Sequence, residues 1–348
     1  MRLTDPVIGG GPKIQVEYVG FDSLGVKSMC TLVRTPEVTI TIDPGASIES
    51  ASFPLPEKRR RQLLRERAEA CRQACMKSQA IAISHYHLDH FIPRRDANIY
   101  AGKILFAKSV DDLPQRQKNR AKTFHRSIDG LPEQVVWADG RRFRFKKTEI
   151  AFSVPIWHGS FHAEPGKVIM TEIKRGKEKA LITSDVSGPT SRETTDLICA
   201  SKAQTVVLDG YPTYHLGRFA TNLDLVLSII NVCRILATKT LSTMVIDHHM
   251  ARDYRYPALF KLAYEKADKL GRQFGTAAEL AGRTSAVLQG YQDYGPTRWH
   301  RWTPLELDEA RRILQKALAE SKTATGRTPP SDFDTQSDWL EQFDRWVA

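Results

Sequence analysis

The sequence predicts an α+β protein: a four-layer αββα sandwich, in which two sheets form the core and helices lie outside, with a helical C-terminal extension. Strand-like segments followed by a helix and a further strand occupy residues 14–83. A similar alternation returns over residues 136–271, so the order occurs twice. The composition changes near the C-terminus. We therefore predict one domain over residues 1–295 and a helical extension over residues 296–348.

The first predicted elements are three strands, a helix and a fourth strand, in that order. Short alternating or apolar runs predict strands over residues 14–19, 28–35, 37–43 and 80–83. Residues 56–77 predict an arginine-rich helix, because apolar side chains recur at i, i+4, i+7 and i+11. The apolar stripe consists of Leu64, Ala68, Cys71 and Cys75.

The second half repeats this mixture after a less regular region over residues 94–135. Strand-like runs return between residues 136 and 185. The chain then alternates between a strand over 205–209, a helix over 222–237, a strand over 243–247 and a helix over 258–271.

The predicted extension contains two helices. Thr303 and Glu306 have the spacing of a capping box, which predicts a helix that ends near Ser321. A proline- and threonine-rich linker follows over residues 322–332, and a short amphipathic helix closes the chain. The extension either packs on the core or engages a partner, and the sequence leaves both possibilities open.

Composition restricts the class of protein. Hydrophobic residues make up 41% and charged residues 26% of the 348 residues, as in globular proteins. No apolar run has the roughly 20 residues of a membrane span, and the N-terminus lacks an apolar signal segment, so we expect a cytoplasmic protein without membrane partners. Five scattered cysteines predict no disulfide framework. The net charge of +11 favours polyanionic ligands, and the oligomeric state, a homo-oligomer included, stays open.

The segment ISHYHLDHFIP, residues 83–93, predicts a metal site. His85 and His87 are two residues apart at the end of a predicted strand, where alternate side chains share a face. Asp89 and His90 follow within one turn and can serve a second ion. Imidazole and carboxylate ligands suit two divalent metal ions, zinc first, with manganese or iron as alternatives. A polar loop is the competing interpretation, but the complete HxHxDH pattern favours metal.

The segment SHYHLDH resembles the HxHxDH signature of metallo-β-lactamase-fold hydrolases, and the resemblance extends over about residues 14–290. It implies further ligands after later strands, at His158, Asp185 and His248. VIDHHMARDY resembles a motif of tRNA 3′-end-processing endonucleases, which selects His248 as the ligand over His249. The chain is more closely similar to a prokaryotic family of uncharacterised predicted metal-dependent hydrolases. The segments that carry this similarity are SLGVKSM, IDPG, SHYHLDH, TSDVSGP, LDGYPTY and DHHMARD.

The resemblance implies a role for each ligand. His85, His87 and His158 hold the first metal, Asp89, His90 and His248 hold the second, and Asp185 bridges them. Two metals about 3.5–4 Å apart can share a bridging hydroxide that attacks the substrate, so no serine or cysteine nucleophile is needed. Asp89 and Asp185 are therefore candidate catalytic residues, and His215 is a candidate proton donor.

Other polar positions have two interpretations each. Asp43 and Asp209 end predicted strands and are expected to support the ligands. Tyr211, Tyr214 and His215 either contact the substrate or form a packed loop. Ser160 and His162 flank His158 and are candidates for the cleft, whereas His125 and His300 are expected at the surface.

The predicted reaction is hydrolysis of a phosphodiester, in nucleic acid or in another phosphodiester substrate. Aspartate at the bridging position argues against the antibiotic hydrolases, which often carry cysteine there, and His87 argues against di-iron oxygen reductases. The basic segments 58–67, 115–126 and 141–147 either gather near the cleft or are ordinary solvated faces. Hydrolysis of a small carboxylic ester, lactone or thioester is the alternative, and a non-enzymatic metal-stabilised scaffold is a third class.

Overall fold

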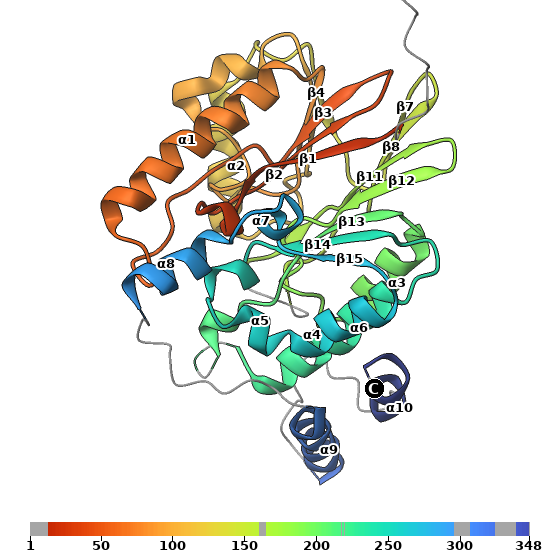
Figure 1. Ribbon diagram of the computed structural model, residues 1–348. Helices are drawn as coiled ribbons and strands as arrows, with labels where there is room; N and C mark the ends of the chain where they lie inside the picture. Colours follow the sequence, from red (N-terminus) through yellow and green to blue (C-terminus); the bar gives the residue numbers. More distant parts are fainter. Residues whose placement is uncertain are drawn as a thin grey trace, which may run out of the picture.

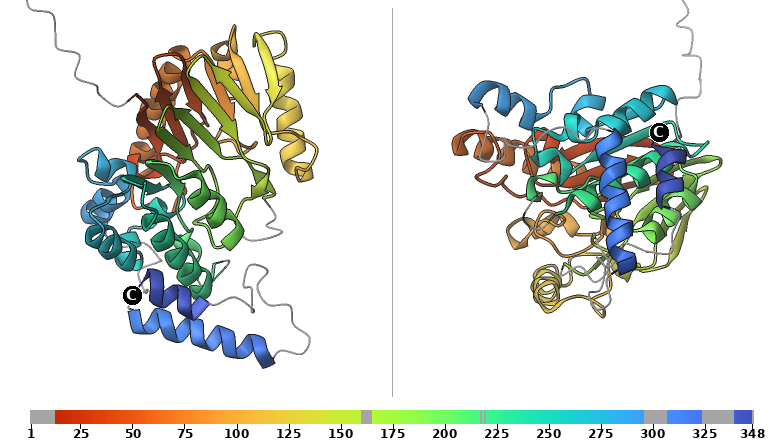
Figure 2. Two further views of the ribbon diagram at one scale, coloured as in Figure 1. Left: turned by 90° about the vertical axis from the view of Figure 1, so that its right-hand side faces the viewer. Right: turned by 90° about the horizontal axis from the view of Figure 1, so that it is seen from below.

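Two β-sheets pack face to face at the centre of the molecule, and helices cover both outer faces (Figures 1 and 2). The computed structural model describes residues 13–159, 165–216, 218, 220–295, 307–323 and 339–347. The predicted αββα sandwich is confirmed. No helix among these described residues is both long and apolar enough to cross a membrane.

The first sheet has six strands in the order β1-β2-β3-β4-β5-β6. The first three are antiparallel, and β3 to β6 are parallel. Their bounds are Gln15–Phe21, Met29–Arg34, Thr39–Ile42, Ala80–Ile83, Ile104–Ala107 and Gln134–Trp137. The parallel strands require crossover connections, which the helices α1 and α2 supply.

The second sheet has seven strands in the order β15-β14-β13-β12-β11-β8-β7. The strands β12 to β15 are parallel, and β7, β8, β11 and β12 are antiparallel. From β7 to β15, without β9 and β10, the bounds are Arg142–Phe145, Thr148–Phe152, Thr171–Arg175, Glu178–Ile182, Thr205–Asp209, Thr243–Asp247 and Gln273–Gly275. The strands β9 (Ile156–Trp157) and β10 (Lys167–Val168) form a separate small ribbon.

Alternation of side chains along the strands builds the core. In β4, Ala80 and Ala82 face the second sheet, whereas Ile81 and Ile83 face the helices. In β13, Val207 lies between the sheets and its neighbours pack on the outer helices. Strands buried on both faces read as continuous apolar runs, which explains AIAI and TVVL. Each fully buried aliphatic side chain contributes about 1.5–3 kcal/mol.

The helices divide between the two outer faces. The helices α1 (Glu57–Met76) and α2 (Gln115–Ser127) cover the first sheet, while α3 (Arg192–Ser201), α4 (Asn222–Leu236) and α6 (Lys261–Lys269) cover the second. The shorter helices are α5 (Tyr256–Leu259), α7 (Ala277–Leu280) and α8 (Ala286–Tyr294), with 3₁₀ turns η1 (Asp22–Leu24), η2 (Arg94–Tyr100), η3 (Thr213–His215) and η4 (Met250–Arg252).

Two details of the predicted elements need correction. The buried face of α1 comprises Leu63, Cys71, Ala74 and Cys75, so its first apolar contact is Leu63 and not Leu64. The helices α3, α7 and α8 and the strands β5 and β15 were not predicted, because α3 and α8 are half polar and α7, β5 and β15 have only three or four residues. Short elements of this kind carry too little periodicity to be distinguished from loops.

The C-terminal helices α9 (Leu307–Thr323) and α10 (Trp339–Trp346) pack on α4 (Figures 1 and 2). The inner side of α4 faces the second sheet, and its outer side joins one apolar cluster with the two terminal helices. Their buried side chains are Ala310, Leu314, Trp339, Phe343 and Val347. Of the two possibilities for the extension, the structure therefore shows packing on the core. The capping box at Thr303 lies outside the described residues. So does the linker over 322–332, apart from Lys322 and Thr323, which belong to α9. The domain division at 295/296 stays a prediction.

Replacement of Trp339 by alanine is expected to release α10 from α4. Trp339 is fully buried, and truncation of a buried tryptophan costs about 3–5 kcal/mol. The loss should appear as faster hydrogen exchange in α4 and as a lower melting temperature. Glu341→Ala, at an exposed position of the same helix, should change neither. Unaltered exchange in α4 of Trp339→Ala would contradict the packing.

Candidate metal centre

Strand ends from both sheets meet along one edge of the sandwich and bring polar side chains together. Asp43 follows β3 and His85 follows β4 by one residue in the first sheet, while Asp185 follows β12 and Asp209 and Asp247 end β13 and β14 in the second. Parallel strands place their carboxyl ends at the same edge, where ligands gather in such folds.

Asp185 lies between two groups of histidines and presents one carboxylate oxygen to each. Its Oδ2 is 3.1 Å from His158 Nε2 and 3.4 Å from His85 Nε2. Its Oδ1 is 3.0 Å from His90 Nε2 and 3.4 Å from His248 Nε2. A carboxylate divided in this way has the arrangement of a bridge between two ions.

The candidate ligand atoms form compact groups. One contains His85, His87, His158 and Asp185, and a second contains Asp89, His90 and His248. Within each group, the candidate atoms lie within 4.8 Å of one another. The geometry therefore brings together all seven residues that the sequence predicted as metal ligands, and their assignment as ligands stays a proposal.

The buried nitrogen and oxygen atoms of these groups are better arranged to coordinate cations than to form hydrogen bonds with one another. His158 Nε2, His90 Nε2 and Asp185 Oδ1 are buried and lie close to one another, yet none of them has a partner in hydrogen-bond geometry among the described residues. Buried polar atoms without partners are costly, by about 1–3 kcal/mol each. Imidazole nitrogens and carboxylate oxygens converging on two points are the donor set of zinc and related divalent ions.

Three of the histidines have a polar side chain beside their other nitrogen. His248 Nδ1 lies 2.6 Å from Asp22 Oδ2, and His90 Nδ1 lies 3.2 Å from Asp43 Oδ2. His85 Nδ1 is 2.9 Å from the Ser84 hydroxyl, which also donates to Asp43. Such partners fix the tautomer and ring orientation, so that the remaining nitrogen faces the ion. The expected supporting position of Asp43 agrees with this geometry.

The backbone around the centre is tightly constrained. Asp43, Ser184 and His248 have positive φ angles of 49°, 56° and 54°. A β-carbon added to Gly45 would lie 2.4 Å from the backbone nitrogens of His90 and Phe91. Only glycine permits the loop after β3 to approach the HxHxDH segment so closely, which explains the glycine in IDPG.

The charges of the cluster are strongly coupled. Burial lowers the pKa of His90, but the carboxylates of Asp185 and Asp43 outweigh it and raise that pKa to about 10. Burial and the charge of His90 lower the pKa of His85 to about 4. Burial raises the pKa of Asp185, but His90, His248 and His85 hold it well below its usual range. Without metal, protons on His90 and His248 therefore balance the buried carboxylates.

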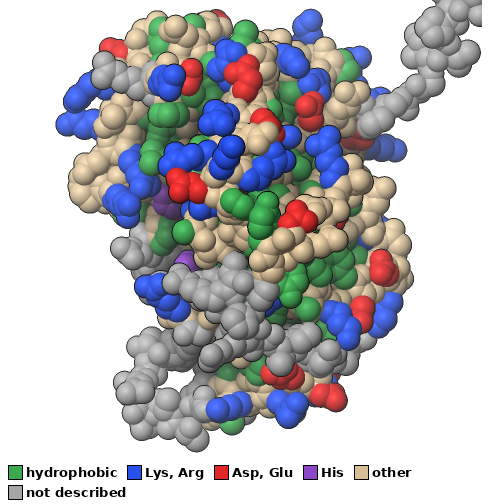
Figure 3. Space-filling model, turned by 60° about the vertical axis from the view of Figure 1, so that its left-hand side comes forward, with side chains coloured by type: hydrophobic (Ala, Val, Ile, Leu, Met, Phe, Trp, Pro, Cys, Tyr) green, Lys and Arg blue, Asp and Glu red, His purple; other side chains and the backbone are tan. Residues whose placement is uncertain are grey.

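A cavity of about 680 Å³ opens above Asp185, and its walls are basic. Lys27, Arg116, Arg120 and Arg252 line it, and the only acidic side chains among its described lining residues are Asp89 and Asp185. Arg252 Nη2 lies 3.7 Å from Asp89 Oδ2, and Arg252 also pairs with Asp22. Figure 3 shows histidine side chains between lysine and arginine side chains on this face of the molecule. Of the three basic segments, 115–126 therefore reaches the cavity.

The two adjacent histidines after β14 have different positions. His248 is fully buried and faces Asp185. His249 lines the cavity, and its Nδ1 lies 2.9 Å from Asp209 Oδ1. This arrangement favours His248 as the ligand, and it places Asp209 behind His249 and not behind a proposed ligand.

The remaining candidates are distributed around this centre. His215 stacks on Tyr214, whose hydroxyl accepts from Arg252, but His215 is not among the described residues that line the cavity. Its role as a proton donor stays a prediction. Ser160, His162 and His300 lie outside the described residues.

One prediction was wrong. His125 was expected at the surface, but it is partly buried, and its Nε2 lies 2.8 Å from the Tyr86 hydroxyl. Its context of arginine and lysine suggested solvent, whereas the helix turns this position toward the first sheet.

Sequence reasoning missed several residues of the site. Asp22, Arg252 and Lys27 were not singled out, and Asp247 was not named although it holds the backbone nitrogens of Ser23, His248 and Ala277. Asp22 comes directly after β1, so the strand-end pattern that identified Asp43 and Asp185 was available for it as well.

Replacement of Asp22 by asparagine is expected to weaken metal binding by about 10–100-fold, because partners behind metal-binding histidines have that effect. Asp209→Asn is the matched control, since Asp209 holds His249 and not His248. Competition of each variant with a fluorescent zinc chelator measures the affinity. A larger loss in Asp209→Asn than in Asp22→Asn would show that His249 is the ligand.

Two face-to-face mixed sheets with outer helices and this histidine–aspartate cluster at their shared edge define a metallo-β-lactamase-fold protein. The UPF0282 protein of Metallosphaera sedula is 36% identical to the chain over 281 residues, which is 79% of this chain and 90% of that protein. The UPF0282 protein of Methanopyrus kandleri is 31% identical over 293 residues, or 80% and 98%. The chain belongs to the UPF0282 family. The predicted kinship with an uncharacterised family of this fold is thereby confirmed.

No family model matches the chain. Among solved structures, the metallo-β-lactamase-fold protein YhfI of Bacillus subtilis aligns with a TM-score of 0.45 and 11% identity, over 76% of this chain and 95% of that one. A possible metal-dependent hydrolase of Veillonella parvula aligns with a TM-score of 0.43 and 9% identity, over 76% and 95%. Likenesses this distant carry no argument about chemistry.

Proposed function

We propose that the protein is a dinuclear metal-dependent hydrolase that cleaves phosphodiesters. One observation carries the proposal. The carboxylate of Asp185 is divided between two histidine groups at the base of a cavity whose walls bear four cationic side chains. The only acidic side chains among the described lining residues are the proposed ligands Asp89 and Asp185, so the site favours an anionic substrate.

The residues have separate tasks. His85, His87 and His158 would hold one divalent ion, Asp89, His90 and His248 a second, and Asp185 both; zinc is the first choice, with manganese or iron as alternatives. When bound, such ions lower the pKa of water toward about 7 and neutralise charge on a phosphoryl group.

The cavity walls would position the substrate. Arg252 is held between Asp22 and the Tyr214 hydroxyl, so its guanidinium is fixed beside Asp89. A fixed guanidinium suits bidentate contact with phosphate oxygens. Arg116 and Arg120, one helical turn apart on α2, face the same space and would contact an adjacent phosphate. His249, whose Nδ1 is held by Asp209, would present its Nε2 to the substrate.

Hydrolysis of a small carboxylic ester, lactone or thioester is the alternative. Leu88 supports it to a degree, because this apolar side chain is 51% exposed and lines the cavity. The four cationic side chains around the same cavity favour the phosphodiester, because a phosphodiester is anionic whereas a neutral ester gains no charge attraction from them.

The test is turnover by the zinc- or manganese-loaded chain. Bis-p-nitrophenyl phosphate, RNA and single-stranded DNA represent phosphodiesters, while p-nitrophenyl acetate and an acyl thioester represent the alternative. Cleavage of a phosphodiester that is lost in the double variant Asp89→Ala, His90→Ala is the expected result. Turnover of the esters alone would favour the alternative reaction. Phosphodiester cleavage that is equal in the double variant would contradict the proposed metal-dependent cleavage at this site.

A further inference from the structure

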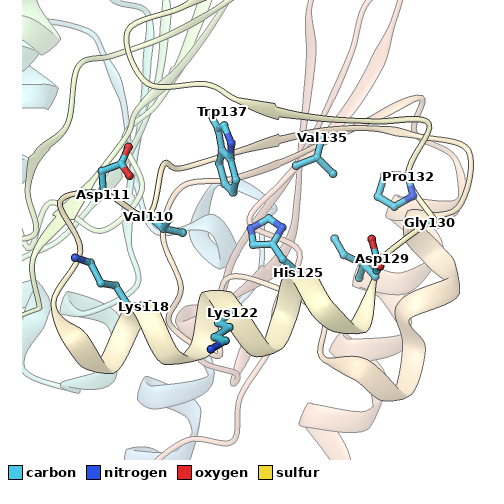
Figure 4. Close-up of a pocket in the computed structure, with 11 residues that line it drawn as sticks. Val110, Asp111, Lys118, Lys122, His125, Asp129, Gly130, Pro132, Val135 and Trp137 are labelled. Atoms are coloured by element: carbon cyan, nitrogen blue, oxygen red, sulfur yellow. The ribbon is translucent and has the colours of Figure 1, made fainter.

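A second cavity lies on the opposite side of helix α2 from the metal cavity. It has a volume of about 720 Å³ and is formed between α2 and the edge strand β6. Figure 4 shows Trp137 pointing from β6 toward α2, with His125, Lys118 and Lys122 on the helix below it. Nothing in the proposed hydrolysis uses this cavity.

Its lining is apolar where it is deep. Ile128 is buried, whereas Val135 and Trp137 are 41% and 43% exposed. These two residues lie two positions apart on β6, so they share the outer face of an edge strand. The ring of His125 makes an edge-to-face contact with the Trp137 indole, with the ring centroids 5.0 Å apart, and the exposed part of the indole supplies a stacking surface for a planar ring.

Two unpaired cations border the apolar surface. Lys118 and Lys122 are one helical turn apart and line the cavity, and neither forms a salt bridge with a described residue. Burial lowers the pKa of His125 to about 4, so the lysines alone carry positive charge there. Asp111 and Asp129 lie at the rim and can accept hydrogen bonds from ring N–H or amino groups.

Helix α2 is basic on two opposite faces. It carries five lysines and arginines and no acidic residue. Arg116 and Arg120 line the metal cavity, whereas Lys118 and Lys122 line the second one. Positions i and i+4 share a helix face, and a displacement of two residues reaches the opposite side. A helix of this kind has phosphate-binding charge along both of its flanks.

The second cavity is also joined to the metal centre. His125 lines it, and the Nε2 of this histidine lies 2.8 Å from the hydroxyl of Tyr86. Tyr86 is fully buried between the candidate ligands His85 and His87 in the chain. The two cavities therefore share a helix wall, and a side chain of the second cavity is hydrogen-bonded to the residue between two candidate ligands.

We propose that this cavity binds a nucleotide unit, with the base against Trp137 and the phosphate on Lys118 and Lys122. An aromatic surface, two free cations and two rim carboxylates match a ring with amino groups joined to a phosphate. The same chemistry has two sources: one unit of a single-stranded nucleic acid, or a free mononucleotide. Binding here does not require hydrolysis at the metal cavity.

The experiment is a titration on the full chain carrying Asp89→Ala and His90→Ala, in the presence of zinc, so that no cleavage accompanies binding. Adenosine, adenosine monophosphate and a five-nucleotide single-stranded DNA are titrated by calorimetry. Trp137→Ala should weaken the binding of all three ligands by about 10-fold, because base stacking on an aromatic residue contributes about that much to affinity. Trp137→Phe should retain most of the affinity and tests the proposal if the alanine variant does not fold.

The lysines should act on the phosphate alone. Lys122→Ala is expected to weaken the binding of adenosine monophosphate several-fold and to leave the affinity for adenosine unchanged. Arg126→Ala is the matched control: it removes one charge from the same helix outside the cavity lining. Tighter binding of the DNA than of the mononucleotide, with the same dependence on Trp137, identifies nucleic acid as the source. Equal affinities identify the free mononucleotide.

Three results would overturn the proposal. The first is no measurable binding of any nucleotide. The second is an equal loss in Lys122→Ala and Arg126→Ala, which would mean unspecific attraction to a basic helix. The third is an oligomer, detected by light scattering, that Trp137→Ala dissociates, since the cavity would then be an interface between copies of the chain.

Discussion

Replacement of Asp185 by asparagine is expected to remove at least one of the two proposed metal ions. Asparagine has the same size but offers one oxygen, whereas Asp185 presents one oxygen to each histidine group. Even residues behind metal ligands change affinity by about 10–100-fold, so we expect a loss of more than about 100-fold for a shared ligand. Elemental analysis of dialysed protein and chelator competition measure the loss, and phosphodiester turnover should fall with it.

The matched control is Asp253→Asn. Asp253 is buried and pairs with Arg255, as Asp185 is buried among histidines, but it does not belong to a candidate metal group. The Asp253→Asn variant should be less stable than the wild-type protein and should keep its metal content. If Asp185→Asn retains both ions at wild-type affinity, the bridging role of Asp185 is wrong.

Much of the site could be predicted because its residues follow strands. An apolar run that ends in histidine or aspartate marks both the strand and the edge to which it delivers the side chain. His85, His158, Asp185 and His248 each follow such a run, and the resemblance to metallo-β-lactamase-fold hydrolases implied that they share one site. The two-sheet architecture followed from the same runs, because strands buried on both faces need helices outside them.

The pairing of a supporting residue with a particular ligand could not be predicted in the same way. Asp22 and His248 are 226 positions apart, and their contact depends on how the loops after β1 and β14 turn at the sheet edge. No local periodicity records such a pairing. Arg252 and Lys27 reach the cavity through these loops, so their role was hidden in ordinary loop sequence.

Helix α2 illustrates a second limit. Its composition predicted a basic segment, and the choice between a solvated face and a functional one was left open. The structure shows that alternate pairs of its cations face two cavities, and only the rotation of the helix on the first sheet determines this. The same rotation places His125 beside Tyr86, so that its ring is partly buried.

Without metal, the histidine cluster is expected to make the protein most stable near pH 6.5. The pKa of His90 is raised from 6.5 to about 10, despite burial, by Asp185 and Asp43, so its contribution is complete below pH 6.5 and is lost as the pH rises through 10. Burial lowers the pKa of His85 from 6.5 to about 4, so stability also falls as the pH drops from 6.5 toward 4. Melting temperatures in EDTA, from pH 5 to 9, should therefore pass through a maximum.

The stabilisation by bound metal should increase with pH on the alkaline side, where the metal-free protein loses stability. His90, as a proposed ligand, would have to lose its proton to hold a divalent ion, so metal binding should strengthen as the pH rises from 6.5 toward 10. Each displaced proton adds about 1.4 kcal/mol of metal-dependent stabilisation per pH unit. Between pH 6.5 and 9 we expect the melting temperature to fall in EDTA, while the increment from micromolar zinc grows. Calorimetry in two buffers of different ionisation enthalpy should detect the released protons. An increment independent of pH would show that the ion does not bind where His90 carries its proton.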